Sequence, residues 1–275
     1  KRCIDPKYED VHSKEKLWYN AVSDRLENIP KIYSYDPLTM GRIGGEHLWN
    51  LKENKEELIN NFCDALDSLH SIAEVDANTD DMIDVYLNKT KSRVEEVRSL
   101  IRDIDEPMVK INSRMCINPL CDEEYFVEHI KKISNIDKFN IIHGDNTFSN
   151  TIADENSKIW FIDPRGVFGS TPIYGDRRYD YAKLYYSAYG NYDSINSKDY
   201  RIKLDRRNVN LEIKSNGYEE FADLIIKRSG VPKAEIQLIH ACIWFALTGY
   251  VKEDYDAVLF AFYKGCQLWT EAVSD

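Results

Sequence analysis

The chain has 275 residues, of which 43% are hydrophobic and 30% are charged, and its formal net charge is −11 at pH 7. This composition is typical of a globular protein, and the length allows one two-lobed domain or two modest domains. The negative charge argues against a nucleic-acid partner, because binding a phosphate backbone requires a basic surface. No apolar run approaches the roughly 20 residues that a membrane helix needs, so we expect no membrane span. The six cysteines lack the spacing of a metal site, which indicates reduced thiols and a cytoplasmic protein.

Hydrophobic spacing predicts an α+β chain whose carboxyl-terminal half is mainly helical. A first helix is expected over 14–26, with Ser13 as its N-cap, and a short hairpin over 31–40 turns at Asp36-Pro37. Two apolar segments, 139–142 and 158–162, flank a polar stretch and are interpreted as the paired strands of a second hairpin. Further helices are expected over 55–72, 79–103, 122–135, 179–189, 221–228, 232–250 and 255–273.

The glycine run Gly41-x-x-Gly44-Gly45 lies between the first hairpin and the next helix. A phosphate-binding P-loop would continue with Lys-Ser or Lys-Thr after a parallel strand, and this run does neither. We interpret it as a hinge or turn.

The most informative segment is IIHGDNTFSNTI, which presents Asp145 and Asn150 after a predicted strand, followed by FIDPRG with Asp163 at the end of the next strand. Phosphoryl transfer requires a carboxylate that orients the attacking hydroxyl and oxygen ligands that hold Mg²⁺ against the nucleotide phosphates. Two strands that fold back on each other would bring these three side chains together. The pattern therefore predicts a phosphoryl-transfer site.

The motif His-x-Asp-x-x-x-x-Asn, followed by a strand ending in Ile-Asp-Pro-Arg-Gly, resembles the choline/ethanolamine kinase and aminoglycoside phosphotransferase group. The resemblance implies a two-lobed protein-kinase-like fold that uses ATP and Mg²⁺. It also implies that Asp145 is the catalytic base and that Asn150 and Asp163 bind the metal. The segment YGDRRYDYAKL is similar to the family's helix that supports the catalytic loop, and Asp180 is the candidate for that role. The segment from Leu66 to His70 resembles the family's Leu-His helix end.

The resemblance assigns the nucleotide side of the site to the first residues of the chain. Glu15 would pair with a phosphate-binding lysine, for which Lys1 is the candidate, and Thr39, Met40 and Arg42 would lie near the adenine.

The family has a phosphate-covering hairpin before that lysine, and the sequence begins at Lys1 without an initiator Met. We therefore expect residues 1–40 to be part of an amino-terminal nucleotide-binding lobe, incomplete here, and residues 41–275 to form a helical catalytic and acceptor-binding lobe.

Two residues beside the motif aspartates have alternative interpretations. His143 can hold the loop or take part in acid–base chemistry, and the structural role is favoured. Arg165 can contact a phosphate or pair with a local carboxylate, and the sequence leaves both open.

The acceptor is expected to be a small alcohol. Choline or ethanolamine is the first choice and a sugar is the second. An aromatic cage with nearby carboxylates can recognise a quaternary ammonium, and Trp244, Tyr250, Glu253 and Asp254 lie where the family builds its acceptor pocket. The segments IDPRG and YGDRRYD also resemble kinase-like proteins of bacterial surface-polysaccharide pathways, which implies a glycan precursor as a further acceptor.

A different class of function remains as an alternative, namely a non-catalytic kinase-like module that binds a nucleotide or a partner and regulates an attached enzyme.

Overall fold

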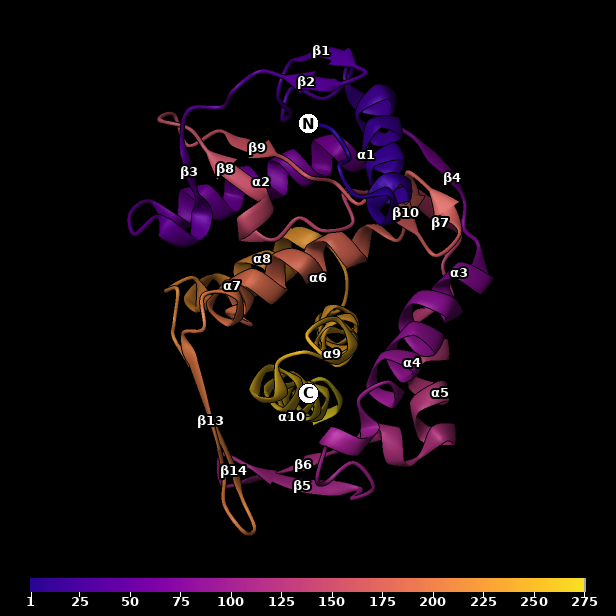
Figure 1. The fold of residues 1–275 in the computed structure, drawn as a ribbon, viewed down its shortest axis with the longest axis vertical. Coiled ribbons are helices and arrows are strands. Elements are labelled where there is room, and N and C mark those ends of the chain that lie inside the picture. The colour runs from indigo at the N-terminus through magenta and orange to yellow at the C-terminus, as the bar shows by residue number, and fades with distance from the viewer. Residues whose placement is uncertain (275) are drawn as a thin grey trace. The chain divides into compact units, whose positions relative to one another are not determined.

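A computed structural model describes residues 1–274 and shows an α+β fold of helices and several small sheets (Figure 1). The chain forms two compact units, each built from three separate segments. The first unit comprises Lys1–Asn78, Asp137–Tyr189 and Gly217–Gly230, and the second comprises Thr79–Ile136, Gly190–Asn216 and Val231–Asp275. The predicted boundary at residue 40 separates a nucleotide-binding lobe from a catalytic lobe. It was based on expected function, whereas the two units are defined by their compactness, so the boundary stays a prediction.

The first unit combines four α-helices with short strands. Its helices are α1 (Glu9–Val22), α2 (Lys55–His70), α6 (Arg177–Ala188) and α8 (Ala222–Ser229), with 3₁₀ turns at Pro6–Tyr8, Leu48–Asn50, Phe148–Asn150 and Glu219–Phe221. Its strands are β1 (Ile32–Tyr35), β2 (Leu38–Met40), β3 (Glu46–His47), β4 (Glu74–Asp76), β7 (Lys138–Ile141), β8 (Thr151–Ala153), β9 (Ile159–Phe161), β10 (Val167–Phe168), β11 (Thr171–Pro172) and β12 (Tyr174–Gly175). The predicted hairpin over 31–40 is confirmed by the antiparallel pairing of β1 with β2.

Helix α1 is confirmed, but it begins at Glu9 rather than after Ser13. Pro6 begins a 3₁₀ turn whose cap is the Asp5 side chain, and this turn leads directly into the helix, so the chain is already helical before Ser13. The helix buries Trp18, and the indole Nε1 donates to Ile142 O over 2.7 Å. This bond ties α1 to the end of β7.

The predicted pairing of the two strands around the motif is wrong. Strand β7 lies between β4 and β12 in one sheet, whereas β9 pairs with β8 in another sheet of order β3-β8-β9. The three residues Thr151–Ala153 follow the motif directly and take the partner position next to β9. A strand of three residues is too short to show an alternation of apolar and polar side chains in the sequence. The longer apolar segment before the motif was therefore predicted as the partner of β9.

The second unit is a helical core with one four-stranded sheet. Its helices are α3 (Thr79–Ile83), a π-helical turn at Asp84–Asn88, α4 (Lys89–Glu95), α5 (Glu123–Ile133), α7 (Tyr192–Asn196), α9 (Lys233–Tyr250) and α10 (Tyr255–Ser274), with 3₁₀ turns at Arg98–Leu100 and Pro119–Cys121. Its sheet has the order β13-β14-β5-β6, from β5 (Met108–Ile111), β6 (Arg114–Ile117), β13 (Tyr200–Leu204) and β14 (Val209–Ile213).

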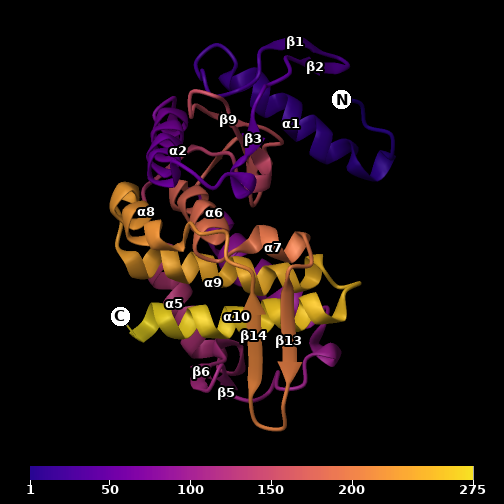
Figure 2. The same cartoon turned by 90° about the vertical axis from the view of Figure 1, so that its left-hand side faces the viewer.

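Helices α9 and α10 lie side by side, as both views show (Figures 1 and 2). Their buried side chains include Trp244, Phe260, Phe262 and Trp269. Figure 2 shows β13 and β14 as a long hairpin. This hairpin was not predicted, because the carboxyl-terminal half was expected to be mainly helical. The predicted helix over 79–103 is interrupted by the π-helical turn and the 3₁₀ turn.

Among residues 1–274, no helix is both long and apolar enough to cross a membrane. The six cysteines are all free thiols, and four of them, Cys63, Cys116, Cys242 and Cys266, are buried.

Candidate active site

The motif residues form a loop between β7 and β8 in the first unit. Gly144 has a φ of +78°, a left-handed conformation that disfavours a side chain, and a Cβ there would lie 3.1 Å from the Cβ of Arg165. The loop closes onto the end of β9, because Arg165 N donates to His143 O over 2.9 Å and Ile162 N donates to Asn150 O over 3.0 Å. These two bonds bring the loop and the strand-end segment together even though β7 and β9 do not pair.

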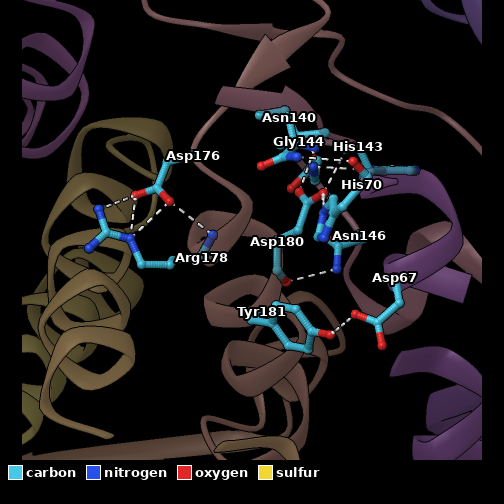
Figure 3. A network of polar contacts seen from close by, with 12 residues as sticks. Asp67, His70, Asn140, His143, Gly144, Asn146, Asp176, Arg178, Asp180 and Tyr181 are labelled. Atoms are coloured by element: carbon cyan, nitrogen blue, oxygen red, sulfur yellow. Dashed lines mark hydrogen bonds and ion pairs between the residues drawn. The ribbon is translucent and has the colours of Figure 1, made fainter. Parts of the chain in front are cut away.

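Asp180, in the first turn of α6, supports this loop from below (Figure 3). Its fully buried carboxylate accepts the backbone N–H groups of His143 and Gly144, each over 2.8 Å. His70 Nε2 at the end of α2 lies 3.1 Å from the same carboxylate, and Asn146 Nδ2 donates to Asp180 O over 2.8 Å. Asp180 thus lies where the supporting role was expected, and the Leu-His helix end contributes a second side chain to it.

The first turn of α6 is itself held by charged and polar contacts, which Figure 3 also shows. Asp176 is the N-cap, its carboxylate accepting Arg178 N over 3.0 Å and pairing with the Arg178 guanidinium at 2.7 Å. One turn later, Tyr181 Oη donates to Asp67 Oδ1 over 2.6 Å. The position of Asp180 is therefore fixed on both sides.

His143 holds the loop through both ring nitrogens. Nδ1 accepts the backbone N–H of Asp145 over 3.2 Å, and Nε2 lies 3.0 Å from Ile162 O, to which it can only donate. This pattern requires the neutral ring with its proton on Nε2. Complete burial lowers the pKa of His143, which agrees with the neutral form. The geometry favours the structural role over acid–base chemistry.

Asp145 presents its carboxylate between two cationic side chains. Lys183 Nζ lies 3.0 Å from Oδ1, and Arg165 Nε lies 3.4 Å from Oδ2. Burial acts to raise the pKa of Asp145, but the charges of Lys183 and Arg165 outweigh it and lower the pKa to about 2. Asp145 is therefore ionised at neutral pH. Of the two roles considered for Arg165, contact with a phosphate or pairing with a local carboxylate, this structure shows the pairing with a carboxylate.

Asn150 contacts the backbone of Asp145, and Asp163 follows β9, whose next residue Ile162 is bonded to Asn150 O. Asn150 Nδ2 donates to Asp145 O over 2.8 Å, which leaves Oδ1 as the amide atom suited to bind a cation. Asp163 has a φ of 52°, and its side chain is 56% exposed. No group of three or more His, Cys, Asp or Glu residues suited to a metal exists among residues 1–274. An amide and one carboxylate fit Mg²⁺ because that ion binds nucleotide phosphates through only one or two protein ligands.

Lys1 pairs with Glu15, as the resemblance implied, and also with Asp163, a contact that was not predicted. Its Nζ lies 2.8 Å from Glu15 Oε2 and 2.7 Å from Asp163 Oδ1. Partial burial acts to lower the pKa of Lys1, but its bonds to Asp163 and Glu15 raise it overall. Glu15 is buried in α1, where His12 Nδ1 also lies 3.6 Å from Oε2. The structure thus brings three predicted site residues from distant parts of the sequence into one ion-paired cluster.

Thr39 and Met40 lie in β2, next to the first residue of the chain. The backbone nitrogen of Lys1 donates to Leu38 O over 2.5 Å, which places Lys1 alongside this strand. Thr39 is exposed, its hydroxyl donating to Pro37 O over 3.0 Å, and Met40 is half-buried. Their role near an adenine ring stays a prediction, as does that of Arg42.

The four residues of the predicted aromatic cage all belong to the second unit. Trp244 is fully buried in α9 and its Nε1 donates to His240 Nε2 over 2.8 Å, so it is a core residue and not the wall of an open cage. The reason is that α9 is apolar around most of its circumference and packs on α10. Tyr250 is 69% exposed, and Asp254 pairs with Lys198 and caps α10 by accepting Ala257 N. An acceptor role for Tyr250, Glu253 and Asp254 stays a prediction.

Sequence reasoning missed Lys183, which contacts the central carboxylate directly. A signal for it exists, because Lys183 follows Asp180 by three residues and therefore lies on the same face of α6. It also missed Asn146, whose side chain is fully buried against α6. Comparison of the chain with protein-family models, with curated proteins and with solved structures finds no match.

Proposed function

We propose that this chain is an ATP-dependent phosphotransferase that acts on the hydroxyl of a small molecule and has a two-lobed kinase-like fold. The observation that carries the proposal is the cluster of Lys1, Glu15 and Asp163, which adjoins the loop of Asp145 and Asn150. A lysine held by a glutamate, an amide and two aspartates is the set that phosphoryl transfer requires. These residues are far apart in the sequence, yet they meet in one cluster.

Each residue of the set has a defined task in this proposal. Lys1, oriented by Glu15, binds nucleotide phosphates, and Asn150 and Asp163 hold Mg²⁺. When bound, Mg²⁺ would neutralise charge on the phosphates. The acceptor hydroxyl donates a hydrogen bond to Asp145, which aligns its oxygen with the γ-phosphorus. A new O–P bond forms as the bond to the ADP oxygen breaks, and the hydroxyl proton passes to Asp145 and then to solvent.

The low pKa of Asp145 determines how this residue would act on the acceptor hydroxyl. A carboxyl group with a pKa of about 2 is a weak base, so it contributes by orienting the hydroxyl more than by removing its proton early. His143 and Asp180 hold the loop that carries it. The acceptor classes are an amino alcohol of the choline type or a sugar, and a glycan precursor for a cell-surface polysaccharide is a member of the second class.

The test is turnover of ATP with Mg²⁺ in a screen of alcohols and sugars, scored as a mass gain of one phosphoryl group on the acceptor. The Asp145→Asn variant should remove this activity while the protein still folds and still binds ATP. A protein that turns over no ATP with any acceptor or with water does not have the proposed function.

A non-catalytic nucleotide-binding module is the second candidate, and the two ion pairs of Asp145 favour it, since they could serve the fold alone. The same experiment separates the two candidates. Magnesium-dependent ATP binding without any turnover, unchanged in Asp145→Asn, would support the module.

A further inference from the structure

We infer that Lys183, together with Arg165, selects the acceptor by charge, so that the hydroxyl substrate is a neutral or anionic polyol rather than a cationic amino alcohol. This inference rests on the proposed function and narrows it to one of the two acceptor classes. It is carried by the positions of two cationic side chains on the carboxylate that must meet the acceptor hydroxyl.

Lys183 is held rigidly for a lysine. Its side chain is only 12% exposed, and its ammonium contacts Asp145 Oδ1 at 3.0 Å. The ammonium also lies 5.1 Å from the ring centre of Tyr186 and 5.8 Å from that of Tyr179, within the range of a cation–π interaction. Both tyrosines lie on α6 with Lys183, about one turn before it and one turn after it. These rings therefore already contact a cation that belongs to the protein.

The backbone on both sides of Asp145 is equally fixed. Helix α6 is bonded to the motif loop through Asp180, so Lys183, one turn further along the helix, has a defined place relative to Asp145. Arg165 is fixed by its backbone bond to His143 O, although its side chain is 46% exposed. The two positive groups thus approach Asp145 from different segments, and both are placed by backbone contacts.

The charges in direct contact with Asp145 have a positive sum. One carboxylate meets one ammonium and one guanidinium, which gives +1 for these three side chains. A small acceptor whose hydroxyl reaches Asp145 brings any charge of its own within about 8 Å of both cations, a distance over which salt does not screen fully. A quaternary ammonium would be repelled there, whereas a neutral ring or a phosphate would not.

The experiment compares two acceptors that have nearly the same shape but differ in charge. Choline carries a quaternary nitrogen, and 3,3-dimethylbutan-1-ol has a carbon atom in its place. We would measure kcat/KM for each acceptor with Mg²⁺ and ATP, using the wild-type chain and the variants Lys183→Met and Lys183→Arg. A panel of neutral sugars and sugar phosphates would be assayed beside ethanolamine on the wild-type protein.

We expect the wild-type protein to prefer the neutral isostere over choline by about tenfold or more. Lys183→Met, which keeps the length of the side chain but not its charge, should reduce that ratio about tenfold, and Lys183→Arg should retain it. Because the ratio is taken on a single sample, loss of folded protein cancels. A structural role for Lys183 would lower both rates together and leave the ratio unchanged.

Three results would overturn the inference: a preference for choline in the wild-type protein, an unchanged ratio in Lys183→Met, or ATP turnover with no neutral or anionic acceptor of the panel phosphorylated. Failure of the proposed function has a different appearance, namely no turnover of ATP under any condition. The two failures are therefore distinguishable.

Discussion

Asp145 and Asp163 both follow a strand and lie close together, yet their surroundings carry opposite charge. Asp145 contacts two cationic side chains, whereas Asp163 shares the single ammonium of Lys1 with a second carboxylate, Glu15. The contacts of Asp145 sum to +1 and the Lys1 cluster sums to −1. A negative cluster suits a divalent cation, and a positively flanked carboxylate suits a hydroxyl that is not attached to a cation. The same residue type is thus specialised by its neighbours.

The substitution Asp145→Asn should have the largest effect. The amide keeps the shape of the side chain but cannot accept the hydroxyl proton, so kcat should fall about a thousandfold. The measurement is phosphoryl transfer to the best acceptor of the screen, with Mg²⁺-dependent ATP affinity as the second readout. Glu155→Gln, an exposed acid in the turn after β8, is the matched control and should change neither. Loss of ATP binding in Asp145→Asn would show that the two aspartates do not have separate tasks.

Replacing Asp180 by alanine should destabilise the first unit by about 3 kcal/mol, because two buried backbone N–H groups and His70 lose their acceptor. The expected result is a lower urea midpoint, accompanied by loss of activity. Asp223→Ala is the matched control, since Asp223 also lies in the first turn of a helix of this unit but is exposed. It should cost only a few tenths of a kcal/mol. Equal effects of the two substitutions would mean that Asp180 does not support the loop.

These two expectations show where sequence reasoning succeeds and where it ends. Sequence motifs and spacing were sufficient to select Asp145, Asn150, Asp163 and Asp180. The structure brings the segments that carry these four residues together. Lys183 was missed because its ion pair joins a helix to a loop: the spacing from Asp180 indicates the helix face on which Lys183 lies but not that this face meets Asp145.

The pairing of β9 with β8 could not be predicted from the sequence for a similar reason. Strand partners are determined by the whole sheet, and β8 is too short to show an alternation. The hairpin of β13 and β14 did carry a signal, since Tyr200, Ile202 and Leu204 alternate with charged residues, but it lies within a stretch dominated by helical spacing.

Asp163→Ala tests the other half of the comparison. It removes one of the two carboxylates around Lys1, and we expect ATP affinity in the presence of Mg²⁺ to fall about tenfold or more, because a charged ligand is lost. ATP binding measured without Mg²⁺ should change little or improve, since Lys1 is then released from Asp163 to bind phosphate. Glu155→Gln serves again as the control. If the loss were the same with and without Mg²⁺, Asp163 would not be a metal ligand.

The smallest expected effect concerns pH and the neutral state of His143. Burial lowers the pKa of His143 in the folded chain, so below the ordinary value of 6.5 the unfolded chain binds a proton that the folded chain does not. Stability should therefore fall as the pH decreases below 6.5, by up to about 1.4 kcal/mol per pH unit for this group. Asp145 acts in the same sense but in a lower pH range: its pKa is lowered from 3.8 to about 2, so its contribution is complete well above pH 3.8 and is lost as the pH falls from 3.8 towards 2.

Between pH 5 and 7 the two groups are thus separable by urea unfolding of the whole chain, because of these two only His143 contributes a slope there. His240 in α9 of the second unit is also buried with a lowered pKa, so it adds a slope of the same sign. The variant His143→Gln, whose amide can replace the Nε2–H donor to Ile162 O, should remove the share of His143 and leave that of His240. A slope that is unchanged in His143→Gln would mean that His143 is protonated in the folded chain. A third positive charge would then lie beside Asp145, and the difference between the two aspartates would depend on pH.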